Sequence, residues 1–414
     1  MVDRGGGAAG VTAHPSGSRV DRRRFDDRPL LVFWETTKAC DLVCVHCRAS
    51  AQRTPGPGEL SNPEARALVD ELASIGSPRP ILVLTGGDCL KRPDLLDVAA
   101  HAQLRRVPLA IAPSVSPLLD DATLAALHAR GVRTASLSLD GASARAHEQV
   151  RGIPGHFVAT LAAIGTLRRN GFKVQVNTTV MASNLEELAD VAVRCHGAGV
   201  DVWEVFFLVA TGRGTDVEAT SAVQNEDVCH FLVDASRYGF TVRTVEAPFF
   251  RRVAAERRAQ DARVGDRNPA GTGPLYARLR ARLEQALGPP ALPVRAPSAA
   301  TRDGKGVVFV AADGGVHPSG FLPVRVGDVR DGGLVAAYRD APLLRSIRGG
   351  AFDGPCGRCA YTDLCGGSRA RAFAASGDPL GSDPGCVRVA ASLDASPSPT
   401  HAGPRPARRL RGRP

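Results

Sequence analysis

Apolar and polar residues between positions 30 and 240 form blocks whose period alternates between that of a strand and that of a helix. Short runs rich in Val, Ile and Leu predict strands, and stretches with apolar residues three or four positions apart predict helices. The predicted strands are residues 31–35, 81–84, 109–112, 135–139, 173–180 and 202–209, and the helices that follow them are residues 62–75, 95–105, 122–130, 157–170, 185–196 and 226–238.

This series of six strand–helix units predicts a parallel sheet with right-handed crossovers. The runs 81–84 and 205–209 are continuously apolar, as expected for strands that are covered on both faces. Six units fall short of the eight that close a barrel. We therefore expect an α/β fold, a partial (β/α)6 TIM-like barrel whose open side admits a large substrate.

Differences in composition divide the residues outside the predicted barrel into two tails, a bridge and a C-terminal segment. The ends are rich in Gly, Arg, Pro and Ser and are expected to be disordered. An Arg-, Ala- and Pro-rich bridge with one helical stretch, around residues 275–287, separates the barrel from a compact C-terminal segment. The expected organisation is a tail over residues 1–28, a core over 29–245, a bridge over 246–305, a small domain over 306–390 and a basic tail over 391–414.

The net charge of +10 is concentrated in the tails. Residues 1–28 hold six Arg and four Asp, and residues 401–414 hold five Arg and no acid. The remainder therefore lacks the basic folded face that nucleic-acid binding requires. The chain contains no run of about 18 apolar residues, the length needed to span a bilayer. No apolar segment follows the N-terminal arginines, as it would in an export signal. We expect a cytoplasmic protein with neither a nucleic-acid nor a membrane partner.

Three of the ten cysteines lie directly after the first predicted strand, as Cys40-x3-Cys44-x2-Cys47. In a parallel barrel this loop belongs to the face where chemistry occurs. Grouped cysteines in a reducing compartment indicate a metal, and three thiolates can hold an iron–sulfur cubane with one iron left open. The alternative is zinc, which takes four ligands; His46 could be the fourth, but neighbouring side chains rarely reach one metal together.

Four more cysteines, Cys356, Cys359, Cys365 and Cys386, form a second set near the C-terminus. Glycines flank them and predict tight turns. Four thiolates complete one cubane with no open iron, and the alternative is a structural zinc knuckle. The isolated Cys195 and Cys229 lie in or near helical patterns and are interpreted as inert buried thiols, and Cys89 is interpreted as incidental.

The segment from Thr37 to Cys47 resembles the signature of the radical S-adenosylmethionine (SAM) superfamily. The resemblance implies that Cys40, Cys44 and Cys47 hold a [4Fe–4S] cluster, whose fourth iron is chelated by SAM. The reduced cluster of such enzymes cleaves SAM to methionine and a 5′-deoxyadenosyl radical, which abstracts hydrogen from the substrate. A reductase, flavodoxin or ferredoxin is the expected electron donor. His46 stands where the family often has an aromatic residue near the adenine.

Later segments resemble further motifs of the same family. Thr85-Gly86-Gly87-Asp88 is similar to the Gly-Gly-Glu motif that binds the SAM amino group, and Arg151 is a candidate partner for a carboxylate. Thr211-Gly212-Arg213-Gly214 is interpreted as a simple turn. The candidate SAM contacts are His46, Gly86, Gly87, Asp88, Ser138, Asp140, Arg151, Asn177 and Leu208.

The C-terminal cysteines, with the glycine-rich runs 315–320 and 327–330, resemble a SPASM-type domain that holds auxiliary [4Fe–4S] clusters. Close relatives have Cys-Gly-Gly-Cys where this chain has Cys365-Gly366-Gly367-Ser368. One auxiliary cluster is therefore expected rather than two.

Three segments look most like the heme-synthesis branch of the family: Trp34-Glu35-x-Thr37, the Gly-Gly-Asp motif and the Arg-Ala-Arg-Ala run at 369–372. We therefore expect radical oxidation or decarboxylation of a tetrapyrrole-like small substrate. A maturase that modifies a ribosomal peptide is the alternative, since such enzymes share the two-domain plan. A non-catalytic zinc protein is the third hypothesis.

Overall fold

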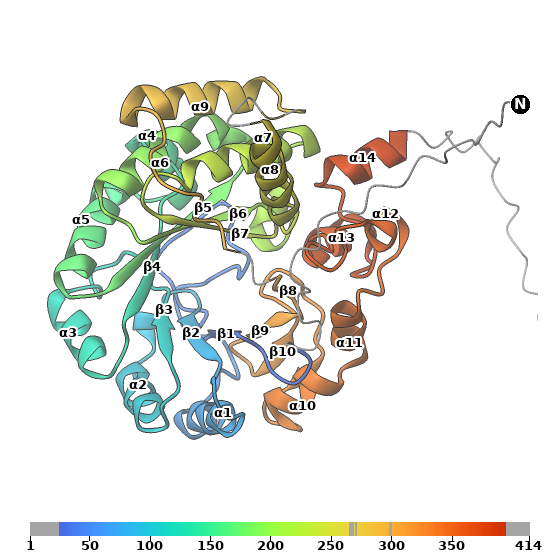
Figure 1. Ribbon diagram of the computed structural model, residues 1–414. Helices are drawn as coiled ribbons and strands as arrows, with labels where there is room; N and C mark the ends of the chain where they lie inside the picture. The colour runs from blue at the N-terminus through green and yellow to red at the C-terminus, as the bar shows by residue number, and fades with distance from the viewer. Residues whose placement is uncertain (1–24, 265–268, 270, 298–299, 395–414) are drawn as a thin grey trace, which may run out of the picture.

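Seven parallel strands form an open barrel with helices on its outer face (Figure 1). The computed structural model describes residues 25–264, 269, 271–297 and 300–394. The strands, in their order across the sheet, are β1 (Leu31–Glu35), β2 (Ile81–Thr85), β3 (Leu109–Ile111), β4 (Thr134–Ser138), β5 (Lys173–Val180), β6 (Val202–Phe207) and β7 (Thr241–Val245). The predicted partial barrel is confirmed, and β7 adds a seventh strand that the hydrophobic pattern did not indicate.

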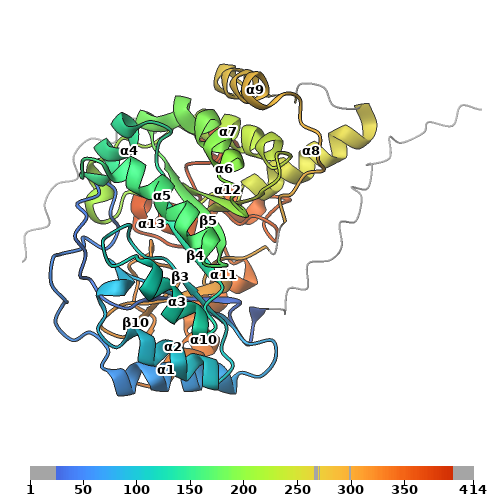
Figure 2. The same ribbon diagram turned by 90° about the vertical axis from the view of Figure 1, so that its left-hand side faces the viewer.

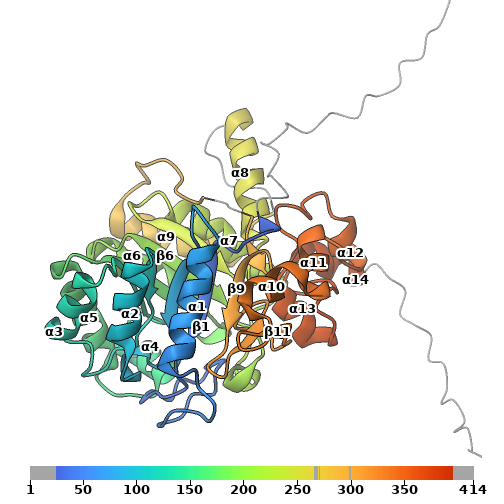
Figure 3. The same cartoon turned by 90° about the horizontal axis from the view of Figure 1, so that it is seen from below.

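Helices cover the outside of this sheet, as Figures 2 and 3 show from the side and from below. The helices that follow the strands are α1 (Asn62–Ser74), α2 (Leu95–Leu104), α3 (Asp121–Ala129), α4 (Ala144–Arg151), α5 (His156–Arg169), α6 (Leu188–Gly197) and α7 (Ala222–Ala235). Short 3-10 helices are η2 (Cys89–Lys91), η3 (Ala182–Glu187) and η4 (Gly212–Asp216). No helix of the described residues is both long and apolar enough to cross a membrane.

Strand alternation sorts side chains between the helical layer and the barrel interior. On β5, Val176 and Thr178 are fully buried, whereas Gln175 and Asn177 line the interior cavity. The buried residues face the helices, since successive side chains of a strand point to opposite faces. The interior is therefore partly polar, which suits a binding site better than a packed core.

The C-terminal segment extends the same sheet. Its strands are β8 (Arg302–Asp303), β9 (Gly306–Val310), β10 (Gly315–His317) and β11 (Gly327–Asp328), and β9 pairs in parallel with β1. Its helices are α10 (Gly333–Asp340), α11 (Pro342–Gly349), α12 (Gly354–Arg358), α13 (Arg369–Ser376) and α14 (Val387–Asp394), which lie beside the barrel (Figure 1). The two parts thus share one sheet.

Polar contacts reinforce this junction. Glu71 of α1 accepts hydrogen bonds from the amides of Leu334 and Val335 at 2.9 and 2.8 Å, which caps the first turn of α10. Arg330 donates to Glu64 of α1 at 2.5 Å. Residues 25–28 also lie against this segment, because the Tyr338 hydroxyl donates to the Phe25 carbonyl at 2.7 Å.

Two helices form the bridge between β7 and β8. The predicted helical stretch is α9 (Pro274–Leu287), which packs on α6 and α7, and α8 (Phe250–Val264) was not predicted. The sequence of α8 is dominated by Arg and Ala, and ion pairs anchor it: Arg252 binds Glu226 at 2.5 Å and Arg257 binds Asp234 at 2.7 Å. A helix anchored by ion pairs lacks the apolar periodicity from which helices are predicted.

Candidate functional site

The first cysteine loop, residues 40–47, leaves the carboxyl end of β1 and folds over the mouth of the barrel. Cys40 and Cys44 are buried and Cys47 is half-buried, and the three pack with Leu42 and Ile153. The amide of Leu42 points to the sulfur of Cys40 at 3.4 Å. Burial raises the pKa of Cys40, and this N–H group opposes that rise because it stabilises the thiolate, the form that binds metals.

The two glycines after β2 allow the chain leading into this loop to pack against β2. A β-carbon at Gly86 would lie 2.4 Å from the carbonyl oxygen of Thr37, and one at Gly87 would lie 2.4 Å from that of Ala39. The amide of Gly87 donates to the Thr37 carbonyl at 2.8 Å. The two glycines therefore leave room for the backbone of Thr37 and Ala39 to pack against them, a role that the sequence motif did not reveal.

Asp88 is buried with three internal donors. Its carboxylate accepts from the amides of Leu90 and Ser114 at 3.1 and 3.3 Å and from the Ser116 hydroxyl at 2.9 Å. Burial raises the pKa of Asp88, and these donors oppose that rise. Ser114 also contacts the sulfur of Cys40 at 3.4 Å. Asp88 thus joins the ends of β2 and β3 beneath the cysteine loop.

Asp140, Arg151 and Cys44 form a buried chain. Arg151 forms an ion pair with Asp140 and donates to the sulfur of Cys44 at 3.5 Å. Although burial alone would raise the pKa of Asp140, Arg151 and His46 hold it below its ordinary value. Burial lowers the pKa of His46 to about 4, so its ring is neutral at pH 7. These four predicted residues come together in the structure.

The segment interpreted as a simple turn, Thr211–Gly214, clamps the cysteine loop from the opposite side. Arg213 donates to the Cys44 carbonyl at 2.9 Å, and its amide donates to the Cys47 carbonyl at 3.0 Å. A β-carbon at Gly212 would lie 2.5 Å from the Cys47 carbonyl oxygen. The Gly-Arg pair directly after a strand was the sequence signal for this clamp, but the cysteine loop that it contacts is distant in the sequence.

The remaining predicted SAM contacts lie around the barrel mouth. Ser138 ends β4 and pairs with Asn177, which lies within β5. Leu208 follows β6 and packs with Val150 and Met181. Among the described residues, no hydrogen bond or ion pair joins their side chains to the cysteine loop, so their relation to SAM stays a prediction.

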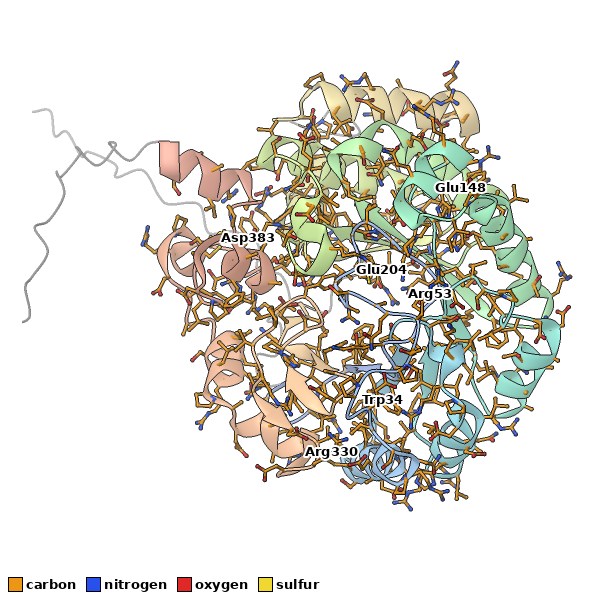
Figure 4. The ribbon with its side chains drawn as sticks, turned by 180° about the vertical axis from the view of Figure 1, so that it is seen from behind. Trp34, Arg53, Glu148, Glu204, Arg330 and Asp383 are labelled. Carbon is orange, nitrogen blue, oxygen red and sulfur yellow. The ribbon has the colours of Figure 1, made fainter. Side chains whose placement is uncertain are left out.

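A cavity of about 1210 Å³ occupies the barrel interior. Residues from β1 to β7 and from the C-terminal segment line it. Arg48, Arg243 and Arg251 line it, as does the half-buried Glu204, whose pKa burial raises. Figure 4 shows Glu204 near the middle of the molecule. The size exceeds that of most small-ligand pockets, about 300–1,000 Å³.

The C-terminal cysteines lie around α12 and the turns that follow it. Cys356 and Cys365 are buried, while Cys359 and Cys386 are half-buried. The amide of Asp383 points to the sulfur of Cys356, and that of Gly367 to the sulfur of Cys365, each at 3.4 Å. Within the described ranges, no three His, Cys, Asp or Glu side chains are gathered tightly enough to hold a single metal ion.

The electrostatic surroundings of this set suit an anionic group. Arg369 is fully buried and donates to the carbonyls of Gly367, Pro379 and Gly381. No carboxylate of the described part of the chain forms an ion pair with it. A β-carbon at Gly367 would lie 2.5 Å from Nη2 of Arg369 and 3.1 Å from the sulfur of Cys356. Thiolates on a metal cluster would compensate this buried charge.

Ser368 points away from these sulfurs. Its hydroxyl donates to Glu246 at 2.5 Å and accepts from the amide of Arg371 at 2.9 Å, which caps α13. Cys89, Cys195 and Cys229 are fully buried, and burial raises the pKa of each thiol. Cys229, although isolated in the sequence, interacts electrostatically with Cys365 and Cys386.

The chain is similar to known proteins over most of its length. Residues 34–195 match the Radical SAM superfamily. The chain is similar to the AdoMet-dependent heme synthase of Methanosarcina barkeri, with 35% identity over 361 residues that cover 87% of this chain and 96% of that protein. It is 32% identical to the AdoMet-dependent heme synthase of Oleidesulfovibrio alaskensis over 384 residues, or 91% of this chain and 92% of that protein.

The fold is also similar to a solved structure, that of SuiB from Streptococcus suis bound to its precursor peptide SuiA. The TM-score is 0.60 at 14% sequence identity, and the alignment covers 86% of this chain and 75% of SuiB. At this identity the similarity supports the fold alone.

Proposed function

Because the chain belongs to the radical SAM superfamily, we propose that it uses SAM-derived radical chemistry to oxidise or decarboxylate a side chain of a tetrapyrrole. It is an enzyme of that superfamily, whose cofactors are a [4Fe–4S] cluster and SAM. When bound, these cofactors supply the 5′-deoxyadenosyl radical that abstracts a hydrogen atom from the substrate. The enzyme class sets aside the hypothesis of a non-catalytic zinc protein.

In this proposal Cys40, Cys44 and Cys47 hold the catalytic cluster. The support is their common loop, the amide and guanidinium groups directed at two of their sulfurs, and the clamps on either side. His46, Gly86, Gly87, Asp88, Ser138, Asp140, Arg151, Asn177 and Leu208 surround or approach the mouth where SAM would lie. Arg151 is already paired with Asp140, so we assign it to positioning Cys44 as well.

The observation that carries the choice of substrate is the cavity. Its volume of about 1210 Å³ and its arginines suit a large, flat molecule with several carboxylates. Arg48 stands at the mouth, where its guanidinium lies 4.4 Å from the centre of the Phe309 ring. The two heme synthases that match along most of the chain point to the same class of substrate.

The C-terminal cysteines complete the proposal. We propose that Cys356, Cys359, Cys365 and Cys386 hold one auxiliary [4Fe–4S] cluster. The support is the amide donors to two sulfurs and the buried guanidinium of Arg369 beside Cys356.

The test is an anaerobic assay of the reconstituted protein with SAM, dithionite and iron coproporphyrin III, an iron porphyrin with propionate side chains. Formation of 5′-deoxyadenosine and loss of carbon dioxide with two hydrogens per converted propionate are expected by mass spectrometry. The Cys40→Ala/Cys44→Ala/Cys47→Ala variant is the control and should form neither product. If SAM is cleaved while the porphyrin is unchanged, the tetrapyrrole assignment is wrong, and the peptide-maturase alternative takes its place.

A further inference from the structure

Two buried carboxyl groups, those of Glu246 and Asp303, meet at the cavity wall where the barrel joins the C-terminal segment. Both residues line the cavity and are 6% and 8% exposed. Glu246 follows β7, and Asp303 ends β8, so each part of the chain supplies one of them. Their carboxyl groups are within hydrogen-bonding contact of each other.

Such a contact requires a proton between the two acids, since two carboxylates have only acceptors. Burial and the neighbouring acid raise the pKa of Glu246 well above its ordinary value, and burial raises that of Asp303. The charged groups that face the pair are Arg251 from α8 and Arg369 and Arg371 from α13. None of these arginines forms an ion pair with either acid among the described residues. The pair therefore keeps a proton although guanidinium groups surround it.

A hydrogen-bond chain leads from this pair to the C-terminal cysteines. The Ser368 hydroxyl donates to Glu246 at 2.5 Å, the Ser368 amide donates to Asp383 at 2.8 Å, and the Asp383 amide points to the sulfur of Cys356 at 3.4 Å. Asp383 lies among the C-terminal helices in Figure 4. On the other side of the pair, Arg251 interacts electrostatically with both Asp303 and Cys365.

The backbone also holds Glu246 in place. Its φ angle is +57°, in the left-handed region that residues other than glycine rarely adopt. The Arg371 side chain donates to the Glu246 carbonyl at 2.7 Å and thereby fixes this conformation. Strained backbone of this kind persists where the surrounding structure holds it, often beside functional groups.

We propose that the Glu246–Asp303 pair is a proton acceptor linked to the oxidation state of the auxiliary cluster. The inference rests on the proposed function, in which the C-terminal cysteines hold that cluster. When the substrate radical is oxidised and the cluster gains its electron, the pair, which shares one proton while the cluster is oxidised, takes up a second proton from solvent. Reoxidation of the cluster releases the electron and this second proton. The coupling follows from Coulomb's law, because an added negative charge nearby favours protonation of an acid.

The test is an EPR-monitored redox titration of the auxiliary cluster between pH 6 and 9. It uses the full chain carrying Cys40→Ala, Cys44→Ala and Cys47→Ala, so that the catalytic cluster contributes no signal. One proton per electron lowers the midpoint potential by about 59 mV for each tenfold fall in proton activity. Adding Glu246→Gln and Asp303→Asn together should make the potential independent of pH. Adding Glu204→Gln instead, which removes another carboxyl group of the cavity wall, should leave the slope unchanged.

A second measurement requires no substitution of the pair. Redox-difference infrared spectra of the same full chain should show a protonated carboxyl band that grows on reduction of the cluster. A pH-independent potential without that band, or an unchanged slope in the folded double variant, would overturn the inference while the cluster assignment stands. Zinc without iron at the C-terminal cysteines would instead overturn the cluster assignment and, with it, the inference.

Discussion

Arg151 donates a hydrogen bond to the sulfur of Cys44 while it neutralises the buried carboxylate of Asp140. Removing one partner of a buried ion pair leaves the other charge uncompensated and costs about 3–5 kcal/mol. Arg151→Met should therefore lower the free energy of unfolding of the metal-free protein by about that amount, measured by urea denaturation. Adding Asp140→Asn should recover part of the loss. Equal unfolding midpoints for Arg151→Met and the wild type would contradict this account.

Gly87 should not tolerate a side chain, although its φ angle is ordinary. Its β-carbon would overlap the carbonyl oxygen of Ala39, at 2.4 Å, and backbone cannot rotate away as a side chain can. Gly87→Ala should destabilise the protein by about 1–3 kcal/mol and disturb the cysteine loop. Gly197→Ala is the matched control, because apart from its chain neighbours and the backbone of its own helix no atom would lie within 4 Å of its β-carbon. Thermal denaturation of both variants gives the comparison, and similar losses would show that the loop does not rest on Gly87.

Asp88 has an internal role that can be separated from a role in binding SAM. Asp88→Asn keeps an oxygen that can accept from Leu90 and Ser114, whereas Asp88→Ala loses all three hydrogen bonds. A charge-assisted hydrogen bond contributes about 1.5–3 kcal/mol, so Asp88→Asn should weaken SAM binding roughly ten-fold or more, with little change in thermal stability. Isothermal titration with SAM measures this. An unchanged dissociation constant in Asp88→Asn would remove its charge from the SAM site.

Ser368 caps α13 and binds Glu246, so it should not be a metal ligand. Ser368→Ala should lower stability by about 1 kcal/mol through the lost cap, while iron in the reconstituted protein stays near about eight per chain, the count for two [4Fe–4S] clusters. Iron and sulfide analysis beside thermal denaturation checks both. About twelve irons per wild-type chain would indicate a third cluster and a misassigned Ser368.

The raised pKa of Glu246 predicts the direction in which stability changes with pH. A carboxyl group whose pKa is raised on folding contributes stability below its unfolded value of 4.5, and loses it as pH rises through the folded value. The melting temperature should therefore fall less steeply between pH 5 and 9 in Glu246→Gln than in the wild type. Hydrogen bonds from Arg330 and Ser61 lower the pKa of Glu64 to about 2, so Glu64→Gln should leave the slope in this range unchanged. Parallel slopes for all three proteins would contradict the prediction.

The sequence predicted what depends on local patterns. Strand runs gave six of the seven barrel strands, and the spacing of Cys40, Cys44 and Cys47 indicated their common loop. Contacts between segments that are far apart in the sequence produce no local pattern and were not predicted. Arg213 clamps the loop through backbone carbonyls, which any residue supplies, and Ser114 reaches Cys40 because β3 ends beside β2. β7 was missed because Arg243 and two threonines give it only a weak apolar pattern, and α8 because ion pairs anchor it.

The parallel pairing of β9 with β1 has a consequence for the order in which the chain acquires its structure. Val32 lies beside Val308, so β1 receives its outer partner only after the whole barrel has been synthesised. Until then the edge of β1 presents unpaired amides and carbonyls, a surface that invites aggregation. Glu35, at the end of β1, also gains its hydrogen bond from the amide of Ala312 only after that segment has been synthesised. The strand that leads into the cysteine loop therefore gains its full set of backbone partners only after β9 has been synthesised.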